Sequence, residues 1–174
     1  YSRAGNHEKS VAIHRQLAAR NPDLPEAYNS WVAAATDSGQ NRLVLEACQK
    51  WNERGKPDWA VLNNCAYGLA VTGGDLTQAE TWANQATRLQ PQQPNVKDTL
   101  GYIYIKQGKF PQAAIIYDGL RQQGLRSASF LLHSGLARAG NGQKQQARLD
   151  FEQALQARPA PAVEQEIRKA LANL

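Results

Sequence analysis

The chain contains few of the residues on which small secreted or metal-binding proteins depend. It has 174 residues with three histidines, two cysteines and no methionine. Cys48 and Cys65 have neither the number nor the spacing of a disulfide framework or a structural zinc site. We therefore expect two free, buried thiols, which behave as small apolar side chains. A disulfide is the alternative if the two Cα atoms lie within ~7 Å. We expect no metal and no other cofactor.

Long apolar segments are also absent. No stretch approaches the ~20 apolar residues that a transmembrane helix needs, and no charged and apolar leader opens the chain. Because methionine is absent, we expect a soluble fragment of a longer protein, with any targeting signal lying elsewhere. No residue pattern assigns a compartment. The chain is 42% hydrophobic and only 20% charged, which is enough for a continuous core, and its abundant alanine, leucine and glutamine favour helix.

Five glycines recur at a nearly constant interval. They are separated by 34, 34, 35 and 34 residues, with the extra residue at the Gly73–Gly74 pair: Gly5, Gly39, Gly73, Gly108 and Gly142. A fixed period of this length is typical of a helical repeat array. Because glycine takes the left-handed conformation without a Cβ penalty, each is predicted to end the first helix of a pair.

Other positions recur in the same register. Three sets step by 34 residues: Ala79, Ala113 and Ala147; Ala83, Tyr117 and Phe151; Pro91, Leu125 and Pro159. The segment from Asn95 to Leu125 resembles a tetratricopeptide repeat, whose pattern is W-x2-L-G-x2-Y followed by Gly, Ala, an aromatic residue, Ala and Pro. Leu100, Gly101 and Tyr104 supply the first part of this pattern. Lys97 stands at the Trp position and Leu125 at the final Pro position.

The resemblance implies an all-α fold. It predicts a right-handed α-solenoid of antiparallel helix pairs, with about ten helices and no sheet. The chain would form one domain, 1–174, with a partial repeat at 1–22, four repeats at 25–57, 59–91, 94–125 and 128–159, and a capping helix at 161–174. Tyr1 and Gly5 would end a first helix, so that residues 7–20 form the second helix of an incomplete repeat. In the capping helix, an apolar stripe that includes Val163, Ile167 and Leu171 should cover the last repeat.

The resemblance also predicts a binding groove. In tetratricopeptide arrays the first helices line a concave surface, and the fifth and ninth positions of each unit, one turn apart, face it. Asparagine can bond both groups of a peptide backbone, and tyrosine adds rigid area at binding surfaces, so we expect a protein or peptide partner. Some family members grip a C-terminal carboxylate with basic residues and asparagines. Only Asn64 matches that clamp, which is therefore not predicted. The candidate groove residues are Asn29, Asn63, Asn64, Tyr67, Asp98, Tyr102, Ile105, Lys106, Leu132 and Leu136.

No catalytic pattern occurs, because His7, His14 and His133 are isolated and no nucleophile or metal motif surrounds them. We expect a non-catalytic, bacterial-type scaffold. One alternative is a regulatory or oligomerisation arm of a larger enzyme. Another is nucleic-acid binding, since residues 88–174 contain twelve Lys and Arg against six Asp and Glu. Trp31 and Trp51 are predicted to lie in the core, and Trp82 to be partly exposed.

Overall fold

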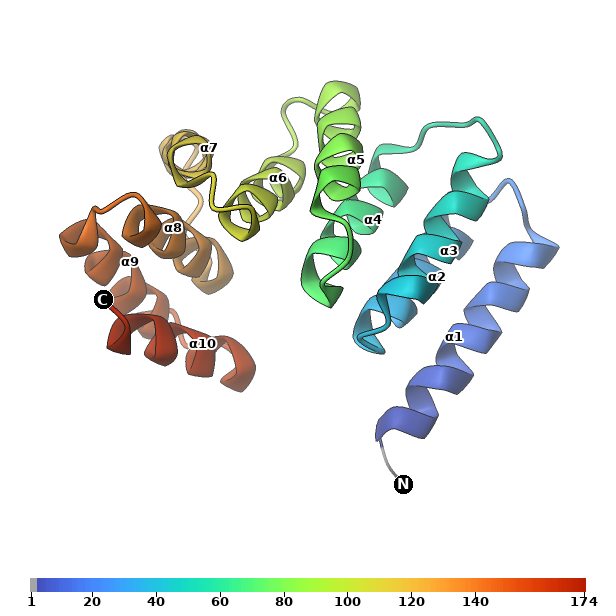
Figure 1. Cartoon of the computed structure of the whole chain (residues 1–174), viewed down its shortest axis with the longest axis horizontal. Helices are drawn as coiled ribbons and strands as arrows, with labels where there is room; N and C mark the ends of the chain where they lie inside the picture. Colours follow the sequence, from blue (N-terminus) through green and yellow to red (C-terminus); the bar gives the residue numbers. More distant parts are fainter. Residues whose placement is uncertain (1–2) are drawn as a thin grey trace. The chain divides into compact units, whose positions relative to one another are not determined.

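The structure, a computed structural model, describes residues 3–174, and every regular element within them is an α-helix. This confirms the predicted all-α class. Tyr1, to which the repeat register gives a helix-ending position, lies outside the described residues. The helices of this part of the chain, drawn in Figure 1, are α1 (Arg3–Arg20), α2 (Pro25–Asp37), α3 (Asn41–Asn52), α4 (Trp59–Thr72), α5 (Leu76–Leu89), α6 (Pro94–Lys106), α7 (Phe110–Gln122), α8 (Ala128–Gly140), α9 (Lys144–Gln156) and α10 (Pro161–Ala172).

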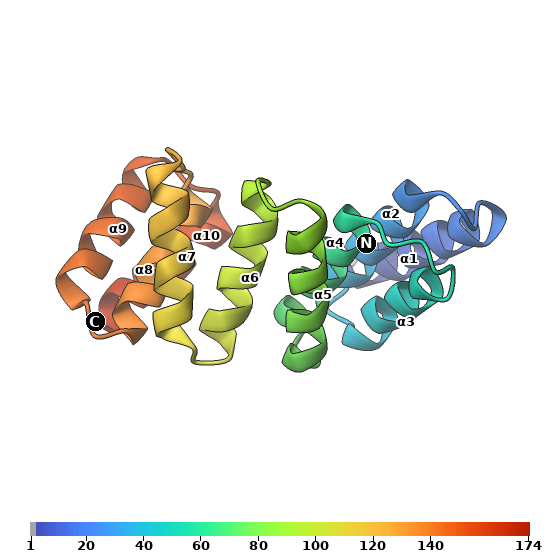
Figure 2. The ribbon, with the colours of Figure 1, turned by 90° about the horizontal axis from the view of Figure 1, so that it is seen from above.

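The chain divides into two compact units, Tyr1–Thr99 and Leu100–Leu174, with the boundary inside α6. In the first unit, α2 packs against α1, α3 and α4, and α4 packs against α5. In the second unit, α8 packs against α7 and α9, and α10 contacts both α8 and α9. The pairing of α4 with α5 and of α8 with α9 can be followed in Figures 1 and 2.

Four of the five periodic glycines end a helix, as predicted. They follow α2, α4, α6 and α8 with φ angles of 71°, 73°, 72° and 77°: Gly39, Gly73, Gly108 and Gly142. The turn predicted at Gly5 is wrong, because α1 runs from Arg3 to Arg20 through this residue. One glycine inside a helix costs only about 1 kcal/mol relative to alanine, so its flanking residues can continue the helix across it.

The glycines of the Leu-Gly motif make room for an aromatic ring on the following helix. A Cβ added to Gly101 would come within 2.8 Å of the Tyr117 ring, and one added to Gly135 would overlap Phe151. Tyr117 and Phe151 are fully buried, each from the second helix of its pair. The motif is therefore a packing requirement, in which the missing side chain lets two helices approach across a ring.

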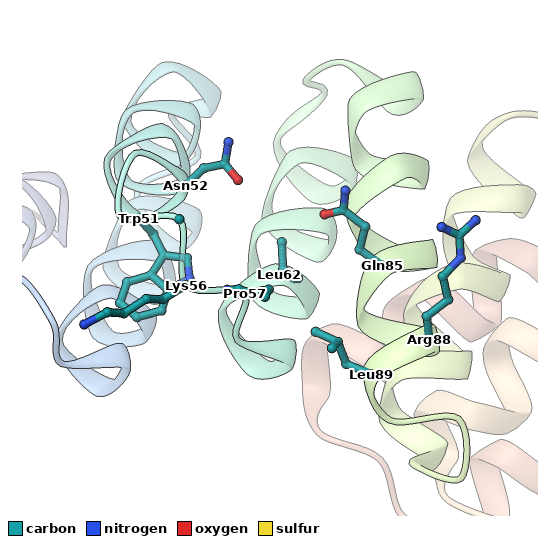
Figure 3. A pocket seen from close by; sticks show the side chains of 9 residues that line it. Trp51, Asn52, Lys56, Pro57, Leu62, Gln85, Arg88 and Leu89 are labelled. Atoms are coloured by element: carbon teal, nitrogen blue, oxygen red, sulfur yellow. The ribbon is translucent and has the colours of Figure 1, made fainter.

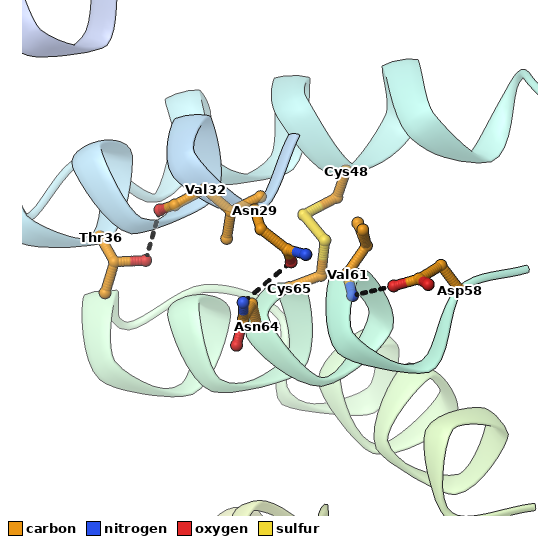
Figure 4. Close-up of a disulfide and its surroundings, with 8 residues drawn as sticks. All are labelled: Asn29, Val32, Thr36, Cys48, Asp58, Val61, Asn64 and Cys65. Atoms are coloured by element: carbon orange, nitrogen blue, oxygen red, sulfur yellow. Dashed lines mark hydrogen bonds between the residues drawn. A yellow bond between two sulfur atoms is a disulfide. The ribbon is translucent and has the colours of Figure 1, made fainter. Parts of the chain in front are cut away.

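The prediction of free thiols is wrong. Cys48 of α3 and Cys65 of α4 form a disulfide, with their Cα atoms 5.8 Å apart (Figure 4). Both cysteines are buried. They face each other because α3 packs against α4, a juxtaposition that follows from the contact between consecutive helix pairs. The bond thus connects one predicted repeat to the next.

The tryptophans belong to the core of the first unit. Trp31 and Trp51 are buried as predicted, and the Trp51 ring lies 5.1 Å from Tyr28, whose pKa burial raises. Trp82 is also buried, so its predicted partial exposure is wrong. Its position explains the error, because Trp82 lies on the inward stripe that Ala79, Ala83 and Ala86 form at helical spacing.

A buried carboxylate connects three helices of the second unit. Asp150 of α9 is only 2% exposed and forms ion pairs with Arg121 of α7 and Arg138 of α8. Its Oδ2 also accepts a 2.7 Å hydrogen bond from the Ser134 hydroxyl. Arg138 in addition pairs with Asp118 at 2.8 Å. A carboxylate buried this deeply is tolerated because two arginines and a hydroxyl group pair with it.

The C-terminal helix α10 covers the second unit. Ile167 is fully buried in the core of this unit, and further apolar residues of the predicted stripe pack against that core. The apolar stripe of α10 therefore packs on the core of the second unit, as its spacing predicts. Polar residues such as Glu166 and Arg168 lie off it.

Candidate functional site

Three of the predicted groove residues come together in the first unit. The Nδ2 group of Asn64 on α4 donates a 2.9 Å hydrogen bond to Oδ1 of Asn29 on α2 (Figure 4). Tyr67, one turn along α4 from Asn64, is 43% exposed. Asn64 and Tyr67 line a cavity of about 240 Å³, and the rest of its wall comes from α2: Val32, Ala33, Thr36 and Asp37.

Local structure fixes the two helices that carry these side chains. The Asp58 carboxylate caps α4 by accepting a 2.9 Å hydrogen bond from the Val61 amide, which satisfies one of the unpaired N–H groups of the first turn. On α2 the Thr36 hydroxyl donates to the Val32 carbonyl at 2.8 Å. We call the surface of Asn29, Ala33, Asn64 and Tyr67 the asparagine surface.

The asparagine pair leaves hydrogen-bonding groups for a partner. Each side-chain amide has an NH₂ group and a carbonyl oxygen. Because Asn64 gives its NH₂ to the oxygen of Asn29, the pair retains the NH₂ of Asn29 as a donor and the oxygen of Asn64 as an acceptor. One donor and one acceptor are what a backbone peptide group requires.

Asn63 and Asp98 lie differently from Asn64. Asn63 is half-buried, its Oδ1 is enclosed without a hydrogen-bond partner among the described residues, and it does not line the cavity beside Tyr67. Asp98, on the part of α6 that belongs to the first unit, is half-buried. The periodicity favoured position 63, whereas the cavity is lined by its neighbour at position 64.

In the second unit, two predicted residues of α6 form an aromatic and cationic group. The Tyr102 ring lies 4.8 Å from the ring of His133 on α8, and the Lys106 ammonium lies 5.3 Å from the centre of the same tyrosine ring. An ammonium at this distance is attracted by the ring face. Ile105 packs against the core of this unit. His133 was not among the predicted site residues. Its position next to Leu132, on the first helix of its pair, is the sequence feature that could have indicated it.

The two leucines predicted at the end of the groove lie under α10. Leu132 is 2% exposed and belongs to the core, and Leu136 packs against that core. Both line a small cavity of about 240 Å³ whose other wall includes Lys169 and Ala170 of α10. Leu132 therefore offers almost no surface to a partner.

No group of three or more His, Cys, Asp or Glu side chains within the described range could hold a metal ion. None of the helices between residues 3 and 174 is long and apolar enough to cross a membrane. His14 is half-buried, as predicted, with an enclosed Nδ1.

The helices of the chain superpose on those of known repeat proteins. A tetratricopeptide repeat protein from Parabacteroides merdae superposes with a TM-score of 0.74 at 18% identity, covering 97% of this chain and 64% of that one. A thermophilic TPR protein of Thermus thermophilus superposes with a TM-score of 0.73 at 18% identity, covering 97% and 92%. The chain has the tetratricopeptide-repeat fold.

A third structure with this fold is YrrB, described as a TPR protein with an unusual peptide-binding site. It superposes with a TM-score of 0.68 at 13% identity, covering 95% of this chain and 84% of that one. No protein-family model matches the sequence, and no curated protein matches it. At these identities the likeness concerns the tetratricopeptide fold. The chain also spans only 64% of the Parabacteroides protein's length.

Proposed function

We propose that the chain is a non-catalytic scaffold that binds an extended peptide segment of a partner protein on the asparagine surface. The observation that carries this proposal is the asparagine pair, which retains one donor and one acceptor beside the exposed Tyr67 ring. Backbone recognition by amides, with an aromatic ring as an apolar anchor, suits a partner in extended conformation.

The fold supports the same proposal in general terms. Its structural neighbours are repeat proteins, and one of them, YrrB, has a peptide-binding site. Helical repeat arrays use their extended surfaces for binding. Asp98 in the first unit remains a predicted partner contact, as do Tyr102, Ile105, Lys106 and Leu136 in the second unit.

The nucleic-acid alternative loses support from the second unit. Arg121 and Arg138 belong to the basic C-terminal half, but both are engaged by the buried Asp150 carboxylate. Their charge is therefore partly neutralised inside the protein and cannot contribute fully to phosphate binding. A regulatory or oligomerisation arm of a larger enzyme would use the asparagine surface in the same way, with the bound segment in its own chain or a second copy.

A peptide library displayed on phage tests the proposal. The protein should enrich a family of peptides, and Tyr67→Ala and Asn64→Ala should each weaken the selected peptides about tenfold or more, as expected for an anchor and a backbone contact. Ile115→Ala is the matched control, because Ile115 is an exposed apolar residue of α7. No enrichment, or equal loss with the control, would contradict the proposal.

A further inference from the structure

A cavity of about 360 Å³ lies in the first unit, away from the asparagine surface. It is bounded by the end of α3, the segment that joins α3 to α4, the first turn of α4 and the last turn of α5 (Figure 3). Its volume falls at the lower end of the range for small-molecule sites. The lining residues are Trp51, Asn52, Gly55, Lys56, Pro57, Leu62, Gln85, Arg88 and Leu89. We call it the α3–α5 cavity.

One part of the α3–α5 cavity is apolar. Trp51 and Leu62 are buried and form its inner wall, whereas Leu89 is 44% exposed. Figure 3 shows the Leu89 side chain directed from α5 toward Pro57 and Leu62. The arrangement is a cleft between an aromatic ring and aliphatic side chains, which suits a compact apolar group.

The other part of the cavity is polar, and Figure 3 shows the Lys56 ammonium directed away from Leu62 and Leu89. Lys56 and Arg88 are its charged residues, Asn52 and Gln85 supply amides, and no acidic side chain of the described chain lines it. Three acids close in sequence to the cavity or paired with its residues are already engaged, one of them with Lys56. Asp58 caps α4, Glu53 pairs with Lys50, and Asp23 pairs with Arg54 and Lys56.

Arg88 is the uncompensated charge of this cavity. It is exposed, and no carboxylate within residues 3–174 pairs with it. Lys56 shares Asp23 with Arg54, so its charge is only partly balanced. A guanidinium binds a carboxylate through two parallel hydrogen bonds. The cavity thus has an apolar wall and a cation that would recognise an anion at its rim.

We propose that the α3–α5 cavity binds an apolar carboxylate: a compact aromatic or branched aliphatic group, placed against Trp51, Leu62 and Leu89, whose carboxylate pairs with Arg88. Two sources share this chemistry, a free small acid and the last residue of a polypeptide. The site uses other residues than the asparagine surface, and the proposal goes beyond the peptide-binding function above.

The neighbouring disulfide gives this site a fixed frame. Cys48 precedes Trp51 by one turn of α3, and Cys65 follows Leu62 by one turn of α4. The covalent bond therefore holds together the two helices that form the inner wall. Binding at a pre-formed wall loses less affinity to ordering of the protein.

Titration of the ¹⁵N-labelled chain, followed by NMR, tests the proposal with four probes. These are 3-phenylpropionate, its amide, a glycine-serine peptide ending in phenylalanine with a free carboxylate, and the same peptide amidated. The resonances to follow are the Trp51 indole N–H and the Gln85 and Arg88 backbone amides. We expect saturable shifts with at least one carboxylate, and binding about tenfold or more weaker for the matching amide, because an ionic hydrogen bond is lost.

The two carboxylates distinguish the sources. If the peptide with a free carboxylate binds more tightly than 3-phenylpropionate, the ligand is a polypeptide terminus. If 3-phenylpropionate binds at least as tightly as this peptide, the ligand is a free acid. Arg88→Gln should remove the preference for the carboxylate over the amide, while the matched variant Arg42→Gln, an exposed arginine of α3, should retain it. Leu89→Ser should weaken both forms. Equal binding of carboxylates and amides to the unmodified protein, or no saturable shift with any probe, would overturn the proposal.

Discussion

Both units are built from packed pairs of α-helices, but different interactions connect the helices in each unit. In the first unit a disulfide connects α3 and α4, and Tyr28, Trp31 and Trp51 form a buried aromatic cluster. In the second unit a buried carboxylate, Asp150, connects α7, α8 and α9 through two arginines and a hydroxyl beside the apolar core. The repeat pattern thus specifies the spacing of the helices but not which interactions, covalent or ionic, connect them.

This difference has consequences for stability. A covalent bond is insensitive to salt and sensitive to reducing agents, whereas an ion pair responds to mutation of either charge. Reagents and substitutions that destabilise one unit should therefore spare the other. Four substitution experiments test what stabilises each unit, in order of decreasing effect.

Removing the Asp150 carboxylate should have the largest effect. Asp150→Ala leaves Arg121 and Arg138 facing each other in a partly buried space, and breaking a buried pair in this way costs about 3–5 kcal/mol. Urea denaturation should show the loss. Glu152→Gln, on the exposed side of the same helix, is the control and should be nearly neutral. An unchanged urea midpoint for Asp150→Ala would contradict the conclusion that the Asp150 ion pairs stabilise this unit.

Loss of the disulfide should rank next. The bond joins residues 17 apart in sequence, and a loop of about this length gives roughly 3 kcal/mol through restriction of the unfolded chain. Cys48→Ala with Cys65→Ala should therefore lower the free energy of unfolding by about that amount. Adding a reducing agent to the double variant should have no further effect, while it destabilises the unmodified chain. Equal stability of the two proteins under oxidising conditions would contradict this role.

A pair of glycine substitutions should give effects of opposite sign. Gly135→Ala forces a methyl group against Phe151 and should cost about 1–3 kcal/mol. Gly119→Ala, inside α7 with no atom near the added Cβ, should stabilise the chain by about 0.5–1 kcal/mol, because alanine favours helix. Thermal unfolding measures both. A stabilising effect at position 135 would show that the ring does not fill the space.

The smallest effect is expected at Asp23, which is exposed. Arg54 and then Lys56 lower the pKa of its carboxyl group. Since the folded-state pKa is below the unfolded value, the stabilisation is present above pH 4 and disappears as the pH falls through the folded pKa. Asp23→Asn should lower Tm slightly at pH 7, and the difference from the unmodified chain should shrink as the pH is lowered below 4. A larger change than that of Gly135→Ala would indicate that the pair is not merely a surface contact.

The parts of this structure that follow from local periodicity could be predicted from the sequence. The turns at Gly39, Gly73, Gly108 and Gly142 required only the glycine interval. The buried position of Trp82 also follows from periodicity, because Trp82 shares a stripe with Ala79, Ala83 and Ala86; the expected partial exposure considered only its place one residue before Ala83.

Contacts between helix pairs were harder to predict. The Cys48–Cys65 bond and the environment of Asp150 depend on how α3 meets α4 and how α7, α8 and α9 converge. A single signal existed for Asp150, an acid between Ala147, Phe151 and Ala154 on the inward stripe. For the asparagine surface, periodicity indicated the turn of α4 that carries Asn63 and Asn64, but which of the two lines the cavity depends on the packing of α2 against α4.

Mapping a selected peptide onto the chain tests the central claim most directly. Backbone and side-chain amide resonances of the ¹⁵N-labelled protein should be recorded during titration with a peptide enriched from the library. We predict that the largest shifts fall on the side-chain amides of Asn29 and Asn64 and on the backbone of Ala33 and Tyr67, and that Tyr67→Ala abolishes them. Shifts confined to other residues would contradict the assignment of peptide binding to the asparagine surface.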